Sequence, residues 1–207
     1  MATRASAEDR RRQLLDAAVR VFARQGFHGC RVSDIADEAG VAYGLVYHYF
    51  GSKDLILDTL FLERWDLLLE AISSVQNRRG EARDKLHSVA GFIIDSYRHD
   101  PELMKVIIVE VTRAANSFGG RHFGKIREAY DGIAEIVRDA QRVGTFRTDV
   151  GADFAAMTFY GAIEQVLTAW IFGVLDQSED SYEDAKRSIV ATICDGLDAP
   201  SPQRVLD

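Results

Sequence analysis

Apolar residues recur along this chain at the spacing of an α-helix. Leu14, Ala18, Val21 and Phe22 follow i, i+4, i+7, i+8 and predict one apolar face on a first helix, which Gly26 ends. Strand-like alternation is hard to find. The same reasoning predicts further helices over about 33–39, 43–49, 53–76, 122–142, 150–175 and 182–197, with another around 86–97 and one that starts at 101. We therefore expect an all-α protein.

Polar residues mark the starts of three of these helices. Ser52 stands at the N-cap position of the long helix, with Asp54 in its first turn to suit the helix dipole. Asp100 followed by Pro101 predicts a helix that starts at the proline. Asp149 is expected to cap the apolar helix that follows it.

The composition, 47% apolar and 28% charged, is that of a globular protein with a real core. No apolar run is long enough to span a bilayer and no signal-like apolar segment follows the N-terminus, so we expect a cytoplasmic protein without a membrane partner. Cys30 and Cys194 match no metal spacing and are expected to be reduced thiols.

The net charge of −7 is unevenly distributed. Residues 1–53 carry eight Lys and Arg against six Asp and Glu, whereas the remainder carries 17 against 26. A polyanionic partner would therefore meet the N-terminal end. The arginine run at 10–12 is either a solvated helix end or an arm near phosphates.

The two short helices, joined by a turn that contains Gly40, have the form of a helix-turn-helix. Six apolar residues are expected to fill the small core behind it: Ile35, Ala36, Ala39, Val41, Val46 and Phe50. The outward side of the second helix then carries Tyr43, Gly44, Tyr47 and His48. In such a unit the second helix enters the major groove of DNA, where hydroxyl and imidazole groups can donate to phosphates. The shape alone fits a second interpretation about as well, namely an ordinary helical hairpin whose aromatic residues pack on a neighbouring helix.

The segment "GFHGCRVSDIADEAGVAYGLVYHYFGSKDLI" resembles the N-terminal signature of the TetR family of bacterial transcriptional repressors. The resemblance runs from about Leu14 to Leu60 and includes the "DIADEAGV" core and the "YHYF" tail. It implies a three-helix DNA-binding domain over 1–52, followed over 53–207 by a helical bundle for ligand binding and dimerisation. The family's DNA contacts fall at the positions of Arg31, Ser33, Ala42, Tyr43, Gly44, Leu45, Tyr47, His48 and Lys53.

This sequence departs from the family pattern near the bases. Ala42, Tyr43 and Leu45 stand where hydrogen-bonding residues are frequent, so Tyr43 and Leu45 are expected to contact apolar features such as thymine methyl groups. Cys30 stands where Thr is frequent, so Ser33 either caps its helix or contacts DNA. The departures leave open a second function, that of a helical dimeric interaction protein whose helix-turn-helix no longer binds DNA.

The helix over 150–175 is apolar around most of its circumference and should be buried on nearly all sides. With the 182–197 helix it would form a two-fold dimer interface, or it is the central helix of a monomer's core. A homodimer is favoured because the half-sites of a palindromic operator, about 34–36 Å apart, need two recognition helices. Glu164, Gln165 and Thr168 interrupt the helix and should bond across the interface or to a ligand.

Cationic residues gather around the "AANSFGG" segment of an otherwise acidic domain: Arg113, Arg121, His122, Lys125 and Arg127. They suit an amphipathic ligand with an anionic head, such as a fatty acyl-CoA, unless they are a solvated basic edge. "VTRAANSF", "GTFRTDV" and "FYGAIEQVLTAW" are similar to the fatty-acid-degradation branch of the family, which responds to long-chain acyl-CoA. The residues expected at the ligand are Phe92, Tyr97, Ile108, Arg113, Arg121, Phe123, Arg127, Phe159 and Glu164.

No catalytic motif accompanies these features. The sequence lacks the G-x-S-x-G and H-E-x-x-H motifs, and the glycines of "FGGRHFG" lie between helices with no preceding strand. The Glu-x-x-His pairs of a di-iron bundle are also absent. We therefore expect no metal, no cofactor and no enzymatic activity, and interpret the chain as a ligand-released repressor.

Overall fold

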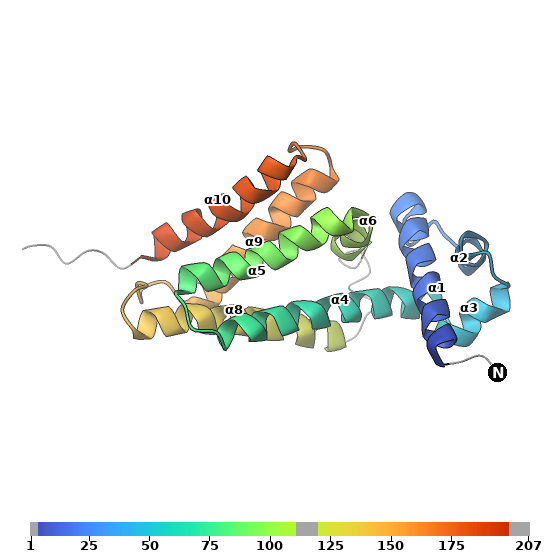
Figure 1. The fold of residues 1–207 in the computed structure, drawn as a ribbon, viewed down its shortest axis with the longest axis horizontal. Helices are drawn as coiled ribbons and strands as arrows, with labels where there is room; N and C mark the ends of the chain where they lie inside the picture. The colour runs from blue at the N-terminus through green and yellow to red at the C-terminus, as the bar shows by residue number, and fades with distance from the viewer. Residues whose placement is uncertain (1–3, 111–119, 199–207) are drawn as a thin grey trace, which may run out of the picture. The chain divides into compact units, whose positions relative to one another are not determined.

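A computed structural model describes residues 4–110 and 120–198 and confirms the all-α architecture (Figure 1). The helices are α1 (Arg4–Gln25), α2 (Val32–Ala39), α3 (Tyr43–Phe50), α4 (Lys53–Gln76), α5 (Ala82–His99), α6 (Pro101–Lys105), the π-helix η1 (Val106–Glu110), α8 (Gly120–Arg142), α9 (Ala152–Ile171) and α10 (Glu179–Leu197). No strand occurs within these ranges, where Phe146 and Asp198 form an isolated bridge. None of the helices described is long and apolar enough to cross a membrane.

Most predicted helix ends are confirmed. Gly26 and Gly40 follow α1 and α2 with φ of 75° and 65°, a left-handed conformation that glycine adopts without strain. The Ser52 hydroxyl accepts a hydrogen bond from the Leu55 amide at 3.2 Å, and the Asp100 carboxylate accepts one from the Leu103 amide at 2.9 Å. Pro101 occupies the first position of α6, as expected.

The prediction that Asp149 caps the apolar helix is wrong. Gly151 is the N-cap of α9, which begins two residues later than expected and ends at Ile171. Asp149 instead accepts a hydrogen bond from Arg147 Nε at 2.6 Å, and this pairing lowers the pKa of Asp149. Asp149 therefore pairs with Arg147, two residues before it, and does not cap α9.

The chain divides into two compact units, Met1–Trp65 with His99–His122, and Asp66–Arg98 with Phe123–Asp207. Helix α4 is continuous and passes from the first unit to the second after Trp65. The packing boundary thus lies beyond residue 52, because Ile56, Leu57 and Phe61 of α4 are buried in the first unit. The division into functional domains at residue 52 remains a prediction.

In the first unit, the apolar face of α1 packs behind the helix-turn-helix. Leu14, Ala18, Val21 and Phe22 are all buried, as are five of the six residues expected in the small core, with Val41 half-buried. The run at 10–12 lies within α1. The Arg11 guanidinium binds the Glu63 carboxylate at 2.5 Å and lies 5.7 Å from the centre of the Phe50 ring. Arg11 therefore holds α1 to α4 and is not part of a free arm.

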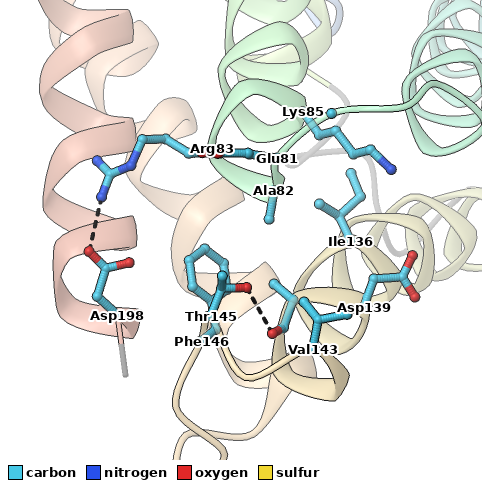
Figure 2. A pocket seen from close by; sticks show the side chains of 12 residues that line it. Glu81, Ala82, Arg83, Lys85, Ile136, Asp139, Val143, Thr145, Phe146 and Asp198 are labelled. Carbon is cyan, nitrogen blue, oxygen red and sulfur yellow. Dashed lines mark hydrogen bonds and ion pairs between the residues drawn. The ribbon is translucent and has the colours of Figure 1, made fainter. Parts of the chain in front are cut away.

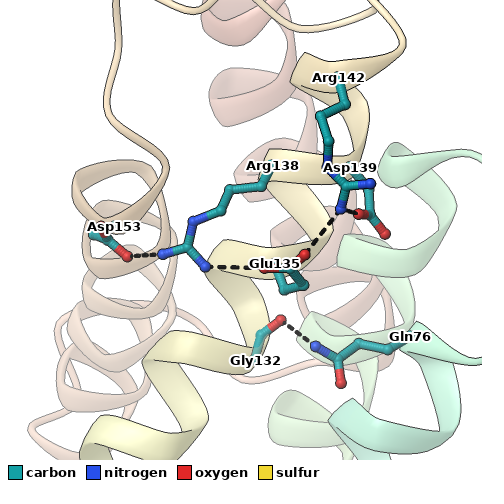
Figure 3. Close-up of polar contacts among 7 residues, drawn as sticks. All are labelled: Gln76, Gly132, Glu135, Arg138, Asp139, Arg142 and Asp153. Atoms are coloured by element: carbon teal, nitrogen blue, oxygen red, sulfur yellow. Dashed lines mark hydrogen bonds and ion pairs between the residues drawn. The ribbon is translucent and has the colours of Figure 1, made fainter.

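In the second unit, α4 and α8 approach each other closely at Gly132. A Cβ atom at this position would lie 2.7 Å from Ile72 Cγ2, closer than packed carbon atoms allow. Gln76 Nε2 donates to the Gly132 carbonyl at 2.8 Å, and Figure 3 shows this contact beside the Glu135–Arg138–Asp153 ion pairs that join α8 to the first turn of α9. The missing side chain is therefore what permits the contact.

Candidate functional site

The outward side of α3 is exposed, as the helix-turn-helix interpretation predicts. Val46 and Phe50 are buried, whereas Tyr43 and Tyr47 are 51% and 43% exposed. Their ring centres lie 4.9 Å apart, and a hydrogen bond to Tyr47 raises the pKa of Tyr43. Because these side chains are exposed, the alternative in which they pack on a neighbouring helix is wrong.

A concavity of about 430 Å³ lies where α2 begins, beside α3 and the start of α4. Five of the predicted DNA contacts line it: Arg31, Ser33, Tyr43, Tyr47 and Lys53. The other four, Ala42, Gly44, Leu45 and His48, are carried by α3 or by its N-cap residue. Ala42, Gly44 and His48 are exposed and Leu45 is half-buried. The predicted contacts thus come together around one short helix.

Ser33 does not cap α2, so that alternative is wrong. The helix begins at Val32, and its N-cap residue is Arg31. The Arg31 amide donates to the Asp34 carboxylate at 2.7 Å, which satisfies one group at the helix start. Ser33 lies in the first turn, half-buried, and its DNA contact remains a prediction.

Lys53 has a structural role that the sequence did not indicate. Its ammonium group donates to the carbonyl oxygens of Phe27 at 2.7 Å and Cys30 at 3.0 Å, and lies 4.7 Å from the centre of the Phe27 ring. These contacts tie the start of α4 to the segment between α1 and α2. An ammonium has three donors and these bonds use two of them, so the phosphate contact of Lys53 stays a prediction.

The predicted ligand residues are spread over several helices. Tyr97 and Phe159 are buried in the second unit, where the Tyr97 hydroxyl donates to Gln177 Oε1 at 3.2 Å. Phe92 on α5 is half-buried, whereas Phe123 and Arg127 on α8 are exposed. Ile108 lies in the π-helix of the first unit, and such helices are frequent at functional sites. Arg113 and the side chain of Arg121 lie outside the described residues.

Glu164 is half-buried beside two tyrosines. Burial raises the pKa of Glu164, and burial together with the Glu164 charge raises the pKa of Tyr130 and Tyr160. The rings of Tyr130 and Tyr160 meet edge to face at 5.4 Å. Of the other polar residues that interrupt α9, Gln165 is exposed and Thr168 is half-buried.

The predicted cluster of open cations is wrong for His122 and Lys125. His122 is buried, with Nε2 2.5 Å from Asp58 Oδ1 and its ring stacked on Phe61 at 4.0 Å. Lys125 forms an ion pair with Asp66. Both side chains therefore pair with carboxylates of α4, and the sequence separation of about 60 residues concealed this pairing.

The second unit contains a concavity of about 420 Å³ that none of the predicted ligand residues lines (Figure 2). It lies between the start of α5, the end of α8 and the segment that follows α8, with Asp198 at its edge. Its apolar lining includes Ala82, Ile136 and Phe146. Arg83 at its rim binds Asp195 and Asp198 at 2.7 and 3.2 Å.

Lys186 is a buried cation that sequence reasoning missed. Its ammonium donates to Asp95 and Glu183, each at 2.7 Å, and so joins α10 to α5. The spacing of Glu183 and Lys186 was a weak signal for an ion pair within α10. The partner on α5 lies 91 residues away and gives no local signal.

In a single chain the apolar helix is buried on one side only, and its burial on nearly all sides stays a prediction that requires a partner. One face of α9 is buried and includes Ala156, Phe159 and Ile163. On another face, the side chains of Phe154 and Met157 are 66% and 56% exposed. Phe172, directly after the helix, is 65% exposed. These three residues form what we call the α9 stripe.

Comparison with known proteins agrees with this arrangement. Residues 14–60 match bacterial regulatory proteins of the tetR family, and residues 61–185 match the C-terminal region of YsiA-like proteins. A fatty acid metabolism regulator protein of Bacillus subtilis (strain 168) is 30% identical over 169 residues, which cover 81% of this chain and 86% of that protein.

Solved structures show the same fold. The fatty acid degradation regulator FadR from Bacillus halodurans matches with a TM-score of 0.77 and 26% identity, over 91% of this chain and 96% of that one. FadR from Bacillus subtilis in complex with stearoyl-CoA matches with a TM-score of 0.72 and 27% identity, over 89% and 98%. With its helix-turn-helix and its helical C-terminal region, the chain belongs to the TetR family of bacterial transcriptional regulators and not to a family of enzymes.

Proposed function

We propose that this protein is a cytoplasmic homodimer that represses transcription from a palindromic operator and is released from it by a long-chain fatty acyl-CoA. The observation that carries the proposal is the match, over 89% of the chain, to a regulator solved in complex with stearoyl-CoA. The relative from Bacillus subtilis, a regulator of fatty acid metabolism by its name, supports the same class of effector.

The DNA-binding part of the proposal is supported by the surface of α3. Its exposed residues suit insertion into the major groove, while Arg31 and the start of α4 lie beside it for phosphate contacts. The assigned contacts are Arg31, Ser33, Ala42, Tyr43, Gly44, Leu45, Tyr47, His48 and Lys53.

The dimer is supported by the α9 stripe. Large exposed apolar residues that recur along one helix are typical of a surface that another protein covers. A two-fold axis beside α9 would place the stripe of one chain against that of its partner and bury both. The resulting pair of α3 helices is what a palindromic operator needs.

For the effector we assign the acyl chain to the apolar interior of the second unit, next to Phe92, Tyr97 and Phe159. Phe123 and Arg127 on α8 are assigned to the more polar end of the ligand. Glu164 would contact its polar groups. Helix α4 carries residues of both units, so a ligand that favours one position of α4 changes operator affinity by its differential affinity for the two states.

A gel shift with the DNA that flanks the protein's own gene tests the proposal. We expect a specific complex, which stearoyl-CoA dissociates and which CoA or stearate alone leaves intact. Native mass spectrometry of the protein as purified from cells should show a dimer mass and any bound CoA thioester. A long-chain acyl-CoA that binds tightly but leaves operator affinity unchanged would contradict the release mechanism.

A further inference from the structure

Helix α3 carries no side chain that can form paired hydrogen bonds to a base. Arg, Lys, Asn, Gln, Asp and Glu are all absent from Tyr43–Phe50, and the N-cap residue is Ala42. In the major groove, Arg and Lys recognise guanine, Asn and Gln recognise adenine, and carboxylates accept from cytosine. If α3 recognises sequence, it must do so through other features of the bases.

What α3 presents at its N-terminal end is aromatic carbon. Tyr43 and Tyr47 lie one turn apart on the exposed side, and their ring planes are inclined at 56°. Their ring centres are 4.9 Å apart, so the two aromatic faces form one continuous exposed surface. Tyr43 is also the first residue of α3. In a helix-turn-helix, the N-terminal residues of the second helix are the ones that contact base edges.

We propose that α3 recognises the C5-methyl groups of pyrimidines in the major groove, with Tyr43 as the specificity-determining side chain and Tyr47 as the residue that holds its ring. Thymine and 5-methylcytosine carry this methyl at the same place on the ring, so they share the chemistry that is recognised. The inference rests on the proposed binding to DNA and adds the feature of the operator that is recognised.

The physical basis is burial of the methyl carbon against an aromatic face. Removing a methylene-sized group from water is worth about fourfold in affinity, without any hydrogen bond. The adjacent ring of Tyr47 limits the orientations open to Tyr43, so little side-chain freedom is lost on binding. Cytosine lacks the methyl, and a purine presents no such group at the groove edge.

The first experiment selects binding sites from random duplex libraries with the full chain. One library is made with thymidine and the other with deoxyuridine, which pairs identically but lacks the methyl. We expect the thymidine library to yield a half-site with thymine at fixed positions, and the deoxyuridine library to lose enrichment there. Equal half-sites from both libraries overturn methyl recognition but leave DNA binding intact. No enrichment from either library contradicts the proposed function itself.

The second experiment measures affinities for the selected site. Deoxyuridine in place of one thymine that Tyr43 recognises should weaken binding about fourfold. At a position where cytosine replaces that thymine, 5-methylcytosine should bind about fourfold better than cytosine. If thymine is recognised but 5-methylcytosine brings no gain, recognition is specific to thymine and the methyl proposal fails.

Variants identify the residue responsible. Tyr43→Ala should abolish the difference between thymine and deoxyuridine, whereas Tyr43→Phe, which keeps the ring, should retain it. Leu55→Ala is the control, because Leu55 is exposed to a similar degree near the start of α4 but lies outside α3. A folded Tyr43→Ala protein with an unchanged difference would remove Tyr43 from this role.

Discussion

Helices α3 and α9 both leave large apolar side chains exposed, but the ends of those side chains differ. On α3, Tyr43 and Tyr47 end in hydroxyl groups. In the α9 stripe, Phe154 and Phe172 end in hydrocarbon and Met157 in a thioether. Aromatic side chains with a polar end suit hydrated interfaces, such as those between protein and DNA. Side chains that end in hydrocarbon suit the apolar centre of a protein–protein interface. Exposed apolar area alone therefore does not identify the partner.

The largest effect is expected from the α9 stripe. The double substitution Phe154→Asp, Met157→Asp should place charges in the dimer interface and give a monomer. Operator affinity should then fall at least about 100-fold, because each monomer brings only one α3 to the DNA. Sedimentation gives the mass and fluorescence anisotropy gives the affinity.

Val143→Asp is the matched control for the stripe. Val143 is 77% exposed but follows α8 and lies outside the stripe, so this variant should remain dimeric. A double variant that keeps the dimer mass would show that the α9 stripe is not the dimer interface.

The next largest effect is expected on α3. Tyr43→Ala should reduce the ratio of operator to non-specific affinity by about 10- to 100-fold, because the side chain that we propose to contact the bases is lost. Folding and dimerisation should be unaffected, since half of this side chain is exposed. Anisotropy with operator and shuffled duplexes checks the ratio, and thermal melting checks the fold. An unaltered ratio would exclude Tyr43 as the recognition residue.

Lys53 tests whether the surface around α3 also contacts phosphates. Lys53→Ala should reduce the steepness of log affinity against log salt by about one and should weaken binding to all sequences alike. The loss of affinity should be about eightfold larger at 0.1 M salt than at 1 M salt. Lys105→Ala is the control, because Lys105 also donates to a backbone carbonyl, that of Ala23 at 3.0 Å. If both variants melt earlier and neither changes the slope, Lys53 only braces the fold.

The smallest effect concerns Glu164 on α9. Burial raises its pKa, so the folded protein holds this proton more tightly than the unfolded chain does. Wild-type stability is therefore lost as pH rises through the folded pKa. Glu164→Gln should raise Tm by roughly 2 °C at pH 8 and should leave Tm unchanged below the ordinary glutamate pKa.

An exposed carboxylate provides the comparison for Glu164. Glu128→Gln on α8 is the control variant, since Glu128 is solvent-exposed and also lies on a helix of the second unit. Equal behaviour of the two variants across the pH range would mean that burial on α9 does not affect the Glu164 carboxyl.

Local signals in the sequence predicted the fold well, because they act within one helical turn. The caps at Ser52 and Asp100 and the glycine after α1 are of this kind. The prediction for Asp149 failed where two local signals competed, since Arg147 binds the carboxylate and Gly151 takes the capping position.

The candidate sites were predictable to different extents for the same reason. Tyr43 and Tyr47 could be placed outward from the apolar pattern of their own short helix. The environments of His122 and Lys186 could not, because their partners Asp58 and Asp95 lie 64 and 91 residues away. The concavity in the second unit likewise combines segments that are distant in the sequence.

The contact at Gly132 restricts how the second unit can move. Ile72 of α4 lies where a side chain of α8 would otherwise be, so the two helices are in close contact at this point. The Gln76 hydrogen bond to the Gly132 carbonyl fixes the register of the same pair. We therefore expect this part of α4 and α8 to move as one rigid body. Any bending that an effector induces must then occur in segments outside this contact.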